Sequence, residues 1–542
     1  MRLIVQWFSY IFCLLFSCKS GHSYEEDILF SNENQKNKET SNAEAGGVLA
    51  LLCSILGYLW WNKNSYKVEK WYFNHFEEIY LGAYGVAILI TFYLVYLIKT
   101  KTKEIDLRAY LLSPLWNKWY YKIYVGKTTD GIELHLSDKV RCSHVQIIGT
   151  TGSGKSHSVV IPWCVRDLKR GLSSIIIDGK GERSLPYQVF KTLDDANIMC
   201  QKQHFDLGNL ENSIEINPLK NGSPQQITDR IFASFDFEDP YYRSIQYDIC
   251  GYLISLIKKT KQIVTFKLLH ELLTNDVKLT ETLSKIDDGP LKTNLKNFLR
   301  EAVKDRKSKL SGLVSQLSPF AVGEVSKVVN GDSSPFERIF LEYGGVDCLI
   351  FSIPTLKYQK LGHQLGKLIL QELSWCVSKR EDFDEKVFTS VFLDEFSEFA
   401  YEEFISVLNK ARSSKVALHL CHQSLSDLKS VSESFAQGVN TNTNVKCILG
   451  LNDPETADFY ARHFGTTTSQ KLTEQVREIG WFRNKEETGR GSMREVEEYK
   501  IHPNVLKQLY QGDGVLHLPT ERGTVTERIK FKPITAKELS ID

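Results

Sequence analysis

Eight consecutive residues have the types and spacing of a phosphate-binding loop. They follow the order G-x-x-x-x-G-K-S and come directly after the apolar run 145–148. The glycines let backbone N–H groups turn inward around phosphate oxygens, and the helix that follows points its positive end at the same anion. Lys155 would supply charge for the outer phosphates, and Ser156 a hydroxyl ligand for Mg²⁺. The predicted nucleotide site consists of Gly149, Thr150, Thr151, Gly152, Ser153, Gly154, Lys155 and Ser156.

Two adjacent carboxylates, Asp394 and Glu395, end a second apolar run at 386–393. At the carboxyl end of a buried parallel strand, Asp394 would hold Mg²⁺ through water. Glu395 would lie where a base can orient the water that attacks the γ-phosphate. A glycine-rich turn is common in ordinary loops, and so is a pair of adjacent carboxylates. The presence of both motifs in one chain favours nucleotide hydrolysis over nucleotide binding alone.

The elements that must position these residues follow an α/β pattern. Beyond residue 140, short β-branched runs alternate with helical stretches, which is typical of a parallel sheet wound by helices. Between residues 221 and 334 the alternation disappears, and an all-helical insertion is predicted there, with helices such as 244–259, 266–273 and 291–306. A charged, turn-rich loop is expected at 481–499. Strands are predicted at 144–148, 174–178, 346–352, 387–394, 416–421, 445–449 and 515–518.

Length and composition indicate a globular chain of two or three domains. The chain has 542 residues, a formal net charge of +1 and eleven cysteines. Bulk charge therefore gives no reason to expect nucleic-acid binding, which would need a local basic surface. The cysteines form no C-x-x-C pair, so they indicate reduced thiols in a cytosolic body and neither a disulfide framework nor a zinc site.

The first hundred residues predict a membrane anchor. Residues 79–98 are twenty uncharged positions, enough to cross a bilayer, and Lys99, Lys101 and Lys103 follow at once. Shorter apolar runs occupy 3–17 and 45–61. Because an ATP-using domain after residue 104 must lie in the cytoplasm, we expect two spans. The sequence leaves open which two of the three segments they are.

The motifs in their order resemble a known family. Nearly the whole of residues 140–520 is similar to the type IV secretion coupling proteins of the TraG/TraD kind, hexameric ATPases of bacterial conjugation. The resemblance depends on the joint order of several short motifs. After the phosphate-binding loop they are Asp178-Gly179-Lys180-Gly181-Glu182, Asn217-Pro218-Leu219, Phe351-Ser352-Ile353-Pro354, Leu393-Asp394-Glu395-Phe396, His422-Gln423-Ser424-Leu425 and Leu451-Asn452-Asp453-Pro454-Glu455.

The resemblance implies roles for three more residues. Arg412 matches the arginine that such ATPases present to a neighbouring subunit's γ-phosphate, although a solvated basic turn is an equal reading. Gln423 matches the family's glutamine that senses the γ-phosphate or holds the water, although a polar strand end is often a simple cap. Asp178 could face the nucleotide, or could equally cap its own loop. The implied catalytic set is Glu395, Arg412 and Gln423, with ATP as the nucleotide and Mg²⁺ on Ser156 and Asp394.

The resemblance also implies an architecture, partners and a location. The expected fold is a RecA-like P-loop nucleotide-binding α/β domain with a parallel central sheet, an inserted all-α domain and N-terminal transmembrane helices. The expected parts are a membrane anchor with a small periplasmic part (1–104), the nucleotide-binding domain (105–222 and 335–542) and the insertion (223–334). The expected location is the bacterial inner membrane with a cytoplasmic ATPase body. The expected partners are single-stranded DNA, relaxase and relaxosome proteins, type IV secretion channel proteins and five further copies of the chain in a homo-hexamer.

The expected function is ATP-driven pumping of single-stranded DNA, with its bound relaxase, into a type IV secretion channel. Two alternatives remain open from the sequence. One is a coupling ATPase that exports protein effectors, and the other is a DNA translocase of the HerA or FtsK kind, which shares the same core.

Overall fold

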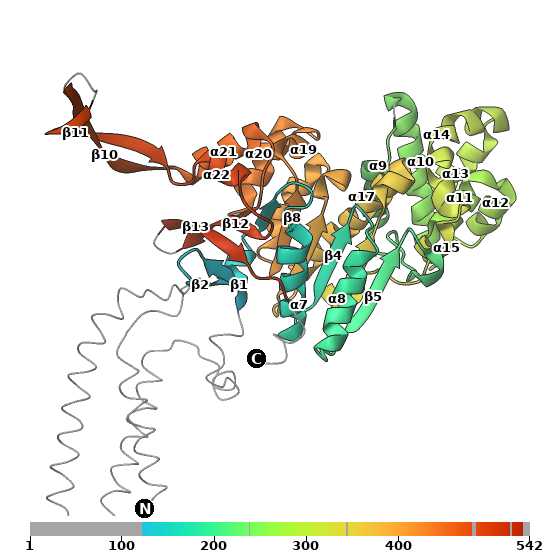
Figure 1. The fold of residues 1–542 in the computed structure, drawn as a ribbon. Helices are drawn as coiled ribbons and strands as arrows, with labels where there is room; N and C mark the ends of the chain where they lie inside the picture. Colours follow the sequence, from blue (N-terminus) through green and yellow to red (C-terminus); the bar gives the residue numbers. More distant parts are fainter. Residues whose placement is uncertain (1–121, 238, 343–344, 480–483, 521–522, 535–542) are drawn as a thin grey trace, which may run out of the picture. The chain divides into compact units, whose positions relative to one another are not determined.

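The computed structural model describes residues 122–534 except 238, 343–344, 480–483 and 521–522, and its centre is an eleven-stranded sheet (Figure 1). Seven neighbouring strands run parallel. Apart from the edge strand β5, they are buried along their whole length, as expected of a parallel sheet covered by helices. Across the sheet they are β9 (Val445–Ile448), β3 (Val145–Ile148), β8 (Val416–His422), β7 (Thr389–Asp394), β4 (Ser174–Asp178), β6 (Asp347–Ser352) and β5 (Gln201–Asp206).

Four antiparallel strands continue the sheet beyond β9. In order they are β12 (Asp513–Thr520), β13 (Gly523–Phe531), β1 (Lys122–Thr128) and β2 (Glu133–Ser137). All seven strands expected from the sequence are present, whereas β1, β2, β5 and β13 were not expected. In β1, Gly126 lies so close to the neighbouring strand that a Cβ would stand 2.2 Å from the Lys530 carbonyl oxygen. Glycine at that position permits the close pairing of the two strands. Because glycine is rare in strands, the sequence around it did not predict one.

Helices follow the parallel strands, and all but the helix after β9 return the chain to the amino end of another parallel strand. They are η1 (Lys155–Val160) with α7 (Ile161–Lys169) after β3, α8 (Ser184–Asp195) after β4, α17 (Thr355–Arg380) after β6, α18 (Ile405–Ala411) after β7, α19 (Leu425–Lys429) with α20 (Glu433–Asn442) after β8, and α21 (Pro454–Phe464) after β9. The loops that leave the carboxyl ends of the strands therefore lie along one edge of the sheet, where ligands bind in open α/β folds.

Between β5 and β6, the described residues form helices and no strand, as predicted. These helices are α9 (Pro224–Ser234), α10 (Pro240–Lys259), α11 (Phe266–Thr274), α12 (Asp276–Ser284), α13 (Pro290–Arg300), α14 (Val303–Ala321), α15 (Ser326–Val329) and α16 (Glu337–Phe340), drawn from green to yellow in Figure 1. The single helix predicted at 291–306 was wrong. The chain is extended at Glu301 and Ala302, and Arg306 donates to the Glu301 carbonyl and to both carboxylate oxygens of Asp276. These tertiary contacts favour the break.

The loop expected at 481–499 was also wrong. Residues 466–499 form a hairpin of two strands, β10 (Thr466–Ile479) and β11 (Asn484–Tyr499), paired with each other in a separate two-stranded sheet. The two strands are defined by the pairing of their backbones, which does not require their sequence to alternate apolar and polar residues. The charged composition that predicted a loop is compatible with this arrangement.

The predicted membrane segments, 3–17, 45–61 and 79–98, lie outside the described residues. Within the part of the chain that the structure describes, no helix is both long and apolar enough to cross a membrane. The predicted domain boundaries stay predictions.

Candidate nucleotide-binding site

The loop between β3 and η1 has the backbone of a phosphate cradle. Gly152 and Gly154 have φ angles of +82° and +97°, in the left-handed region that side chains with a Cβ disfavour. The helix begins immediately afterwards, at Lys155. Its first backbone N–H groups have no partner within the helix and point back into the loop. The glycine-rich loop and the helix start predicted from the sequence are therefore present together, in an arrangement that favours an anion.

Two polar side chains of this loop, those of Lys155 and Ser153, are buried. Lys155 is buried, and its Nζ lies 2.5 Å from the carbonyl oxygen of Gly149. Ser153 Oγ is buried and, within the described residues, has no hydrogen-bond partner. A Cβ on Gly149 would lie 2.5 Å from that same Oγ, so glycine there keeps the hydroxyl in place. An unpaired buried hydroxyl beside a lysine fits a ligand with phosphate oxygens.

Ser156 and Asp394 come together from segments 238 residues apart. Ser156 Oγ donates to Asp394 Oδ2 at 2.7 Å. Burial raises the pKa of Asp394, against the opposing effect of the Ser156 hydrogen bond. A hydroxyl and a carboxylate side by side are oxygen donors of the kind that Mg²⁺ accepts together with substrate phosphates. No group of three or more His, Cys, Asp or Glu side chains in the described ranges could hold a metal alone, so Mg²⁺ would depend on this pair and the nucleotide.

Glu395 and Gln423 face each other across the same edge. Glu395 has a φ of +51°, and its side chain is buried. The Gln423 amide nitrogen lies 3.2 Å from both carboxylate oxygens of Glu395. Thr151 Oγ1 donates to the side-chain amide oxygen of Gln423, Oε1, also at 3.2 Å. Gln423 thus connects the phosphate-binding loop with the candidate base.

Lys180 is a site residue to which the sequence analysis gave no role. Its Nζ lies 3.2 Å from Glu395 Oε1. The carboxylate of Glu395 and that of Glu182 raise the pKa of Lys180 although burial opposes the change. The motif 178–182 contained this residue, but a lysine in a glycine-rich loop carries no signal of its contact with a distant strand end.

Asp178 caps its own loop, which is the second of the two roles expected for it. It lies directly beside Asp394 in the β4–β7 register, and its carboxylate accepts the backbone N–H groups of Lys180 at 2.9 Å and Glu182 at 3.0 Å. Burial, assisted by the negative charge of Asp394, raises the pKa of Asp178 to about 7. Both carboxylate oxygens hold its own loop in place.

Arg412 is not brought to this site within one chain. It is exposed and follows the last residue of α18, just before the amino end of β8, whereas Gln423 follows the carboxyl end of that strand. A seven-residue strand spans roughly 20 Å. The predicted role of Arg412 toward a neighbouring subunit is compatible with this placement and stays a prediction.

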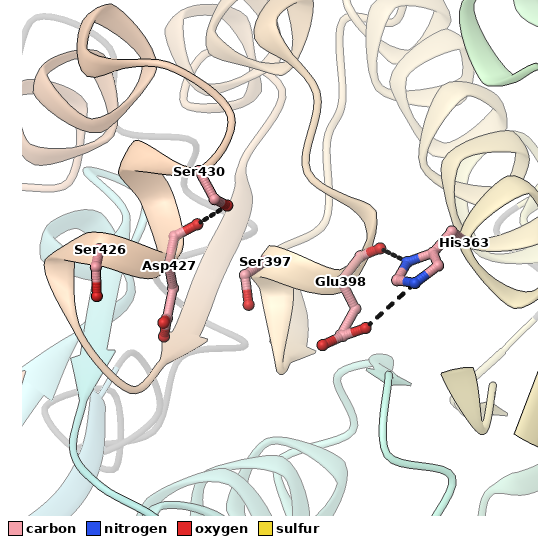
Figure 2. Close-up of a pocket in the computed structure, with 6 residues that line it drawn as sticks. All are labelled: His363, Ser397, Glu398, Ser426, Asp427 and Ser430. Carbon is pink, nitrogen blue, oxygen red and sulfur yellow. Dashed lines mark hydrogen bonds and ion pairs between the residues drawn. The ribbon is translucent and has the colours of Figure 1, made fainter. Parts of the chain in front are cut away.

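An open cleft of about 320 Å³ adjoins the site. Figure 2 shows Ser397 and Glu398 on one side of the cleft, with His363 of α17 against Glu398. On the other side lie Ser426 and Asp427 of α19 and Ser430, which follows that helix. His363 Nε2 lies 3.6 Å from Glu398 Oε2. Glu398 follows the candidate base by three residues, so the cleft gives solvent a route to that edge of the sheet.

Comparison with known proteins connects this arrangement to one family. Residues 389–511 match the family model described as the TraM recognition site of TraD and TraG. The type 4 coupling protein DotL of Legionella pneumophila is 23% identical over 479 residues, which cover 76% of this chain and 60% of DotL.

Solved structures of the bacterial conjugative coupling protein TrwB share the fold. The unbound form is 15% identical with a TM-score of 0.52, and the match covers 76% of this chain and 89% of TrwB. The complex of TrwB with ADP and Mg²⁺ is also 15% identical with a TM-score of 0.52, covering 77% and 91%. The described part of the chain therefore has the RecA-type α/β fold with a large, mostly parallel sheet, and the chain is a relative of the TraG/TraD coupling proteins of type IV secretion.

Proposed function

We propose that this protein is a coupling ATPase of a type IV secretion system. The observation that carries the proposal is the bridge made by Gln423, from Thr151 of the phosphate-binding loop to Glu395. A site that only bound nucleotide would need neither an amide nor a second carboxylate at this position. A hydrolase needs both, to hold and activate water beside the terminal phosphate.

The side chains divide the work as follows. Backbone N–H groups of residues 149–154 and Lys155 would bind the phosphates. Ser156 and Asp394 would hold Mg²⁺, which would supply positive charge for the phosphate oxygens. Glu395 accepts a proton from the attacking water. Gln423 holds that water and the carboxylate of Glu395 in position relative to each other. Arg412 of a neighbouring copy stabilises the transition state with its permanently charged guanidinium.

The proposed cargo is single-stranded DNA with its bound relaxase, delivered to the secretion channel by a homo-hexamer. The proposed anchor is residues 1–104 in the bacterial inner membrane, with N-terminal transmembrane helices and a cytoplasmic ATPase body. The match to the TraM recognition site supports a relaxosome partner, and the likeness of fold to the conjugative protein TrwB supports DNA. Export of protein effectors is the second candidate, because the relative found by sequence, DotL, is described only as a type 4 coupling protein.

The test is the ATPase rate of the purified full chain in detergent, with and without single-stranded DNA, beside a Lys155→Ala variant. We expect Mg²⁺-dependent hydrolysis that single-stranded DNA stimulates and that falls at least about 100-fold in the variant, since loss of a transition-state charge contact has effects of this size. Hydrolysis that needs Lys155 but ignores DNA would favour protein export. Equal rates for wild type and Lys155→Ala would refute the proposed ATPase.

A further inference from the structure

Three buried polar side chains form a hydrogen-bonded path through the sheet behind the site. They are Gln146 on β3, His422 on β8 and Lys446 on β9, which are neighbouring strands, and each is at most 1% exposed. Lys446 Nζ donates to Gln146 Oε1 at 2.8 Å, and Gln146 Nε2 lies 2.7 Å from His422 Nε2. The path continues to the backbone, because His422 Nδ1 lies 2.8 Å from the carbonyl oxygen of Ser424.

Chemistry fixes the direction of each hydrogen bond. A protonated lysine side chain only donates, and Thr443 Oγ1 donates to the same oxygen of Gln146 at 3.2 Å. The oxygen of Gln146 therefore faces Lys446, and its NH₂ group faces His422. His422 must then accept at Nε2 and carry its proton on Nδ1, which donates to the Ser424 carbonyl. Burial lowers the pKa of His422 to about 4. The imidazole is therefore neutral near pH 7, the form that can accept and donate at once.

One end of the path lies beside Gln423. The backbone N–H groups of Gln423 and Ser424 donate to Asp427 Oδ2 at 2.8 and 3.0 Å, while His422 holds the Ser424 carbonyl. The backbone at 423–424 is thus held from both sides. Only the side chain of Gln423 extends into the site, where it reaches Thr151 and Glu395.

The other end lies at the C-terminus of α20. Lys446 Nζ donates to the backbone carbonyl oxygens of Asn440 at 2.8 Å and Thr443 at 2.6 Å. Helix carbonyls at this end have no partner within the helix, and a cation there is favourable. Helix α20 also packs closely on α18, since a Cβ on Gly438 would lie 2.9 Å from the Ile405 side chain. Helix α18 ends immediately before Arg412.

Three buried polar side chains cost more free energy than apolar side chains that would only fill the core. Burying an amine, an amide and an imidazole requires a hydrogen bond for each polar atom, and apolar side chains of similar volume would fill the same space without that requirement. Valine and isoleucine occupy the neighbouring positions Val145, Ile147 and Val445. A polar residue at one position on each of three adjacent strands therefore indicates a specific use.

We propose that Gln146, His422 and Lys446 are positioning residues that fix the backbone of Gln423 and tie it to α20, the helix packed against α18, which ends immediately before Arg412. The inference rests on the ATP hydrolysis proposed above. Through this path, Gln423 would keep its amide between Thr151 and Glu395. A shift of about 1 Å in a group that orients water is enough to slow a reaction by up to about 100-fold.

The test is a double-mutant cycle on the full chain with ATP as the probe. His422→Phe removes both hydrogen bonds, whereas His422→Asn keeps a donor near Nδ1 for the Ser424 carbonyl. We expect His422→Phe to lower kcat about tenfold with less than about a twofold change in the KM for ATP, and His422→Asn to recover most of that loss. In a Gln423→Ala background, His422→Phe should have no further effect, because the residue it positions is gone.

His419 supplies a matched control. It is another fully buried histidine on β8, stacked on Phe392 and hydrogen bonded toward Arg141, away from Gln423. His419→Phe should lower stability and change kcat by the same factor with or without Gln423. If His422→Phe behaves in the same way as this control, the positioning role is overturned.

Lys446→Met tests the same path from its far end if His422→Phe fails to fold. Methionine fills the space without a buried amine, and kcat should again fall at unchanged KM only where Gln423 is present. A kcat equal to that of wild type would overturn the path. Wild-type protein without Lys155-dependent hydrolysis would refute the proposed function and this inference with it. If wild type shows Lys155-dependent hydrolysis but the effects of these variants on kcat simply add to that of Gln423→Ala, only the inference is refuted.

Discussion

The same parallel strands carry charged groups near both of their ends, and the two sets are held in different ways. Near the amino ends, Arg141 of α6 (Asp138–Arg141) is fully buried and makes two parallel hydrogen bonds to Asp167, at 2.8 and 2.7 Å. His419 lies beside the same guanidinium. At the carboxyl edge, the contacts of Glu395 with Gln423 and Lys180 are 3.2 Å long and come from flexible side chains.

The difference separates folding from chemistry within one sheet. Short, bidentate, buried pairing engages both oxygens of Asp167, and Arg170 and His419 contact the same pair, so little hydrogen-bonding capacity is left for a ligand. Longer contacts from side chains that can rotate away leave a carboxylate available to a substrate. Charge and burial alone would mark both clusters as functional candidates. Their pairing geometry indicates that the amino-end cluster serves stability, and it fits the catalytic role proposed above for the carboxyl-edge cluster.

The largest expected effect comes from breaking the amino-end pair. Arg141→Met leaves the carboxylate of Asp167 buried without its main partner, and Arg141 and Arg170 are what hold the pKa of Asp167 well below its usual range against the effect of burial. Removing one partner of a buried pair costs about 3–5 kcal/mol. We expect a correspondingly lower midpoint of urea unfolding.

A double variant controls for loss of volume. Arg141→Met combined with Asp167→Leu replaces the pair by apolar groups and should regain much of the lost stability. The ATPase rate per folded molecule should change little in the double variant. A double variant no more stable than Arg141→Met would contradict the assignment of this pair to folding.

The opposite pattern is expected at the carboxyl edge. Glu395→Gln keeps the size of the side chain but removes its ability to accept a proton, so the ATPase rate should fall about 100-fold or more. ATP affinity and the urea midpoint should stay near wild type, because the contacts of Glu395 with Gln423 and Lys180 are long and lie at the edge of the sheet. A stability loss as large as that of Arg141→Met, with hydrolysis retained, would remove the distinction between the two ends.

The sequence predicted the carboxyl edge much better than the amino end. The phosphate-binding loop, Asp394 and Glu395 are local motifs, and the rule that strands of a parallel sheet end at one edge brings them together. Gln423 was named through family resemblance, and the structure places it between Thr151 and Glu395. Arg412 could not be placed from one chain, because its expected target belongs to another copy.

What the sequence did not predict depends on contacts between distant segments. The ion pair of Lys180 with Glu395 joins residues 215 positions apart, and the path from Lys446 to His422 crosses three strands. A glutamine or lysine within an apolar run carries no local signal of its partner. The same limit applies to β5 and the β10–β11 hairpin, whose polar sequences become strands only through their pairing.

The smallest expected effect is a change in the pH dependence of stability. It concerns Lys446, which lies between the amino-end cluster and the carboxyl-edge cluster. Burial lowers the pKa of Lys446 to about 7 from its ordinary 10.5. Between these values the unfolded chain binds a proton that the folded chain does not, so this lysine makes stability rise with pH, by at most about 1.4 kcal/mol per pH unit. Below about pH 7 both states are protonated, and its contribution is constant.

The prediction compares wild type with Lys446→Met by urea unfolding from pH 6 to 9. Other lysines and the tyrosines titrate alike in both proteins, so their effects cancel in the difference. Stability of wild type relative to the variant should be flat up to about pH 7 and should then rise. Parallel curves over the whole range would mean that Lys446 keeps an ordinary pKa and is stabilised by its four oxygen partners as fully as Arg141 is by Asp167. Lys446 would then belong with the amino-end cluster, as a group whose hydrogen bonds serve the fold.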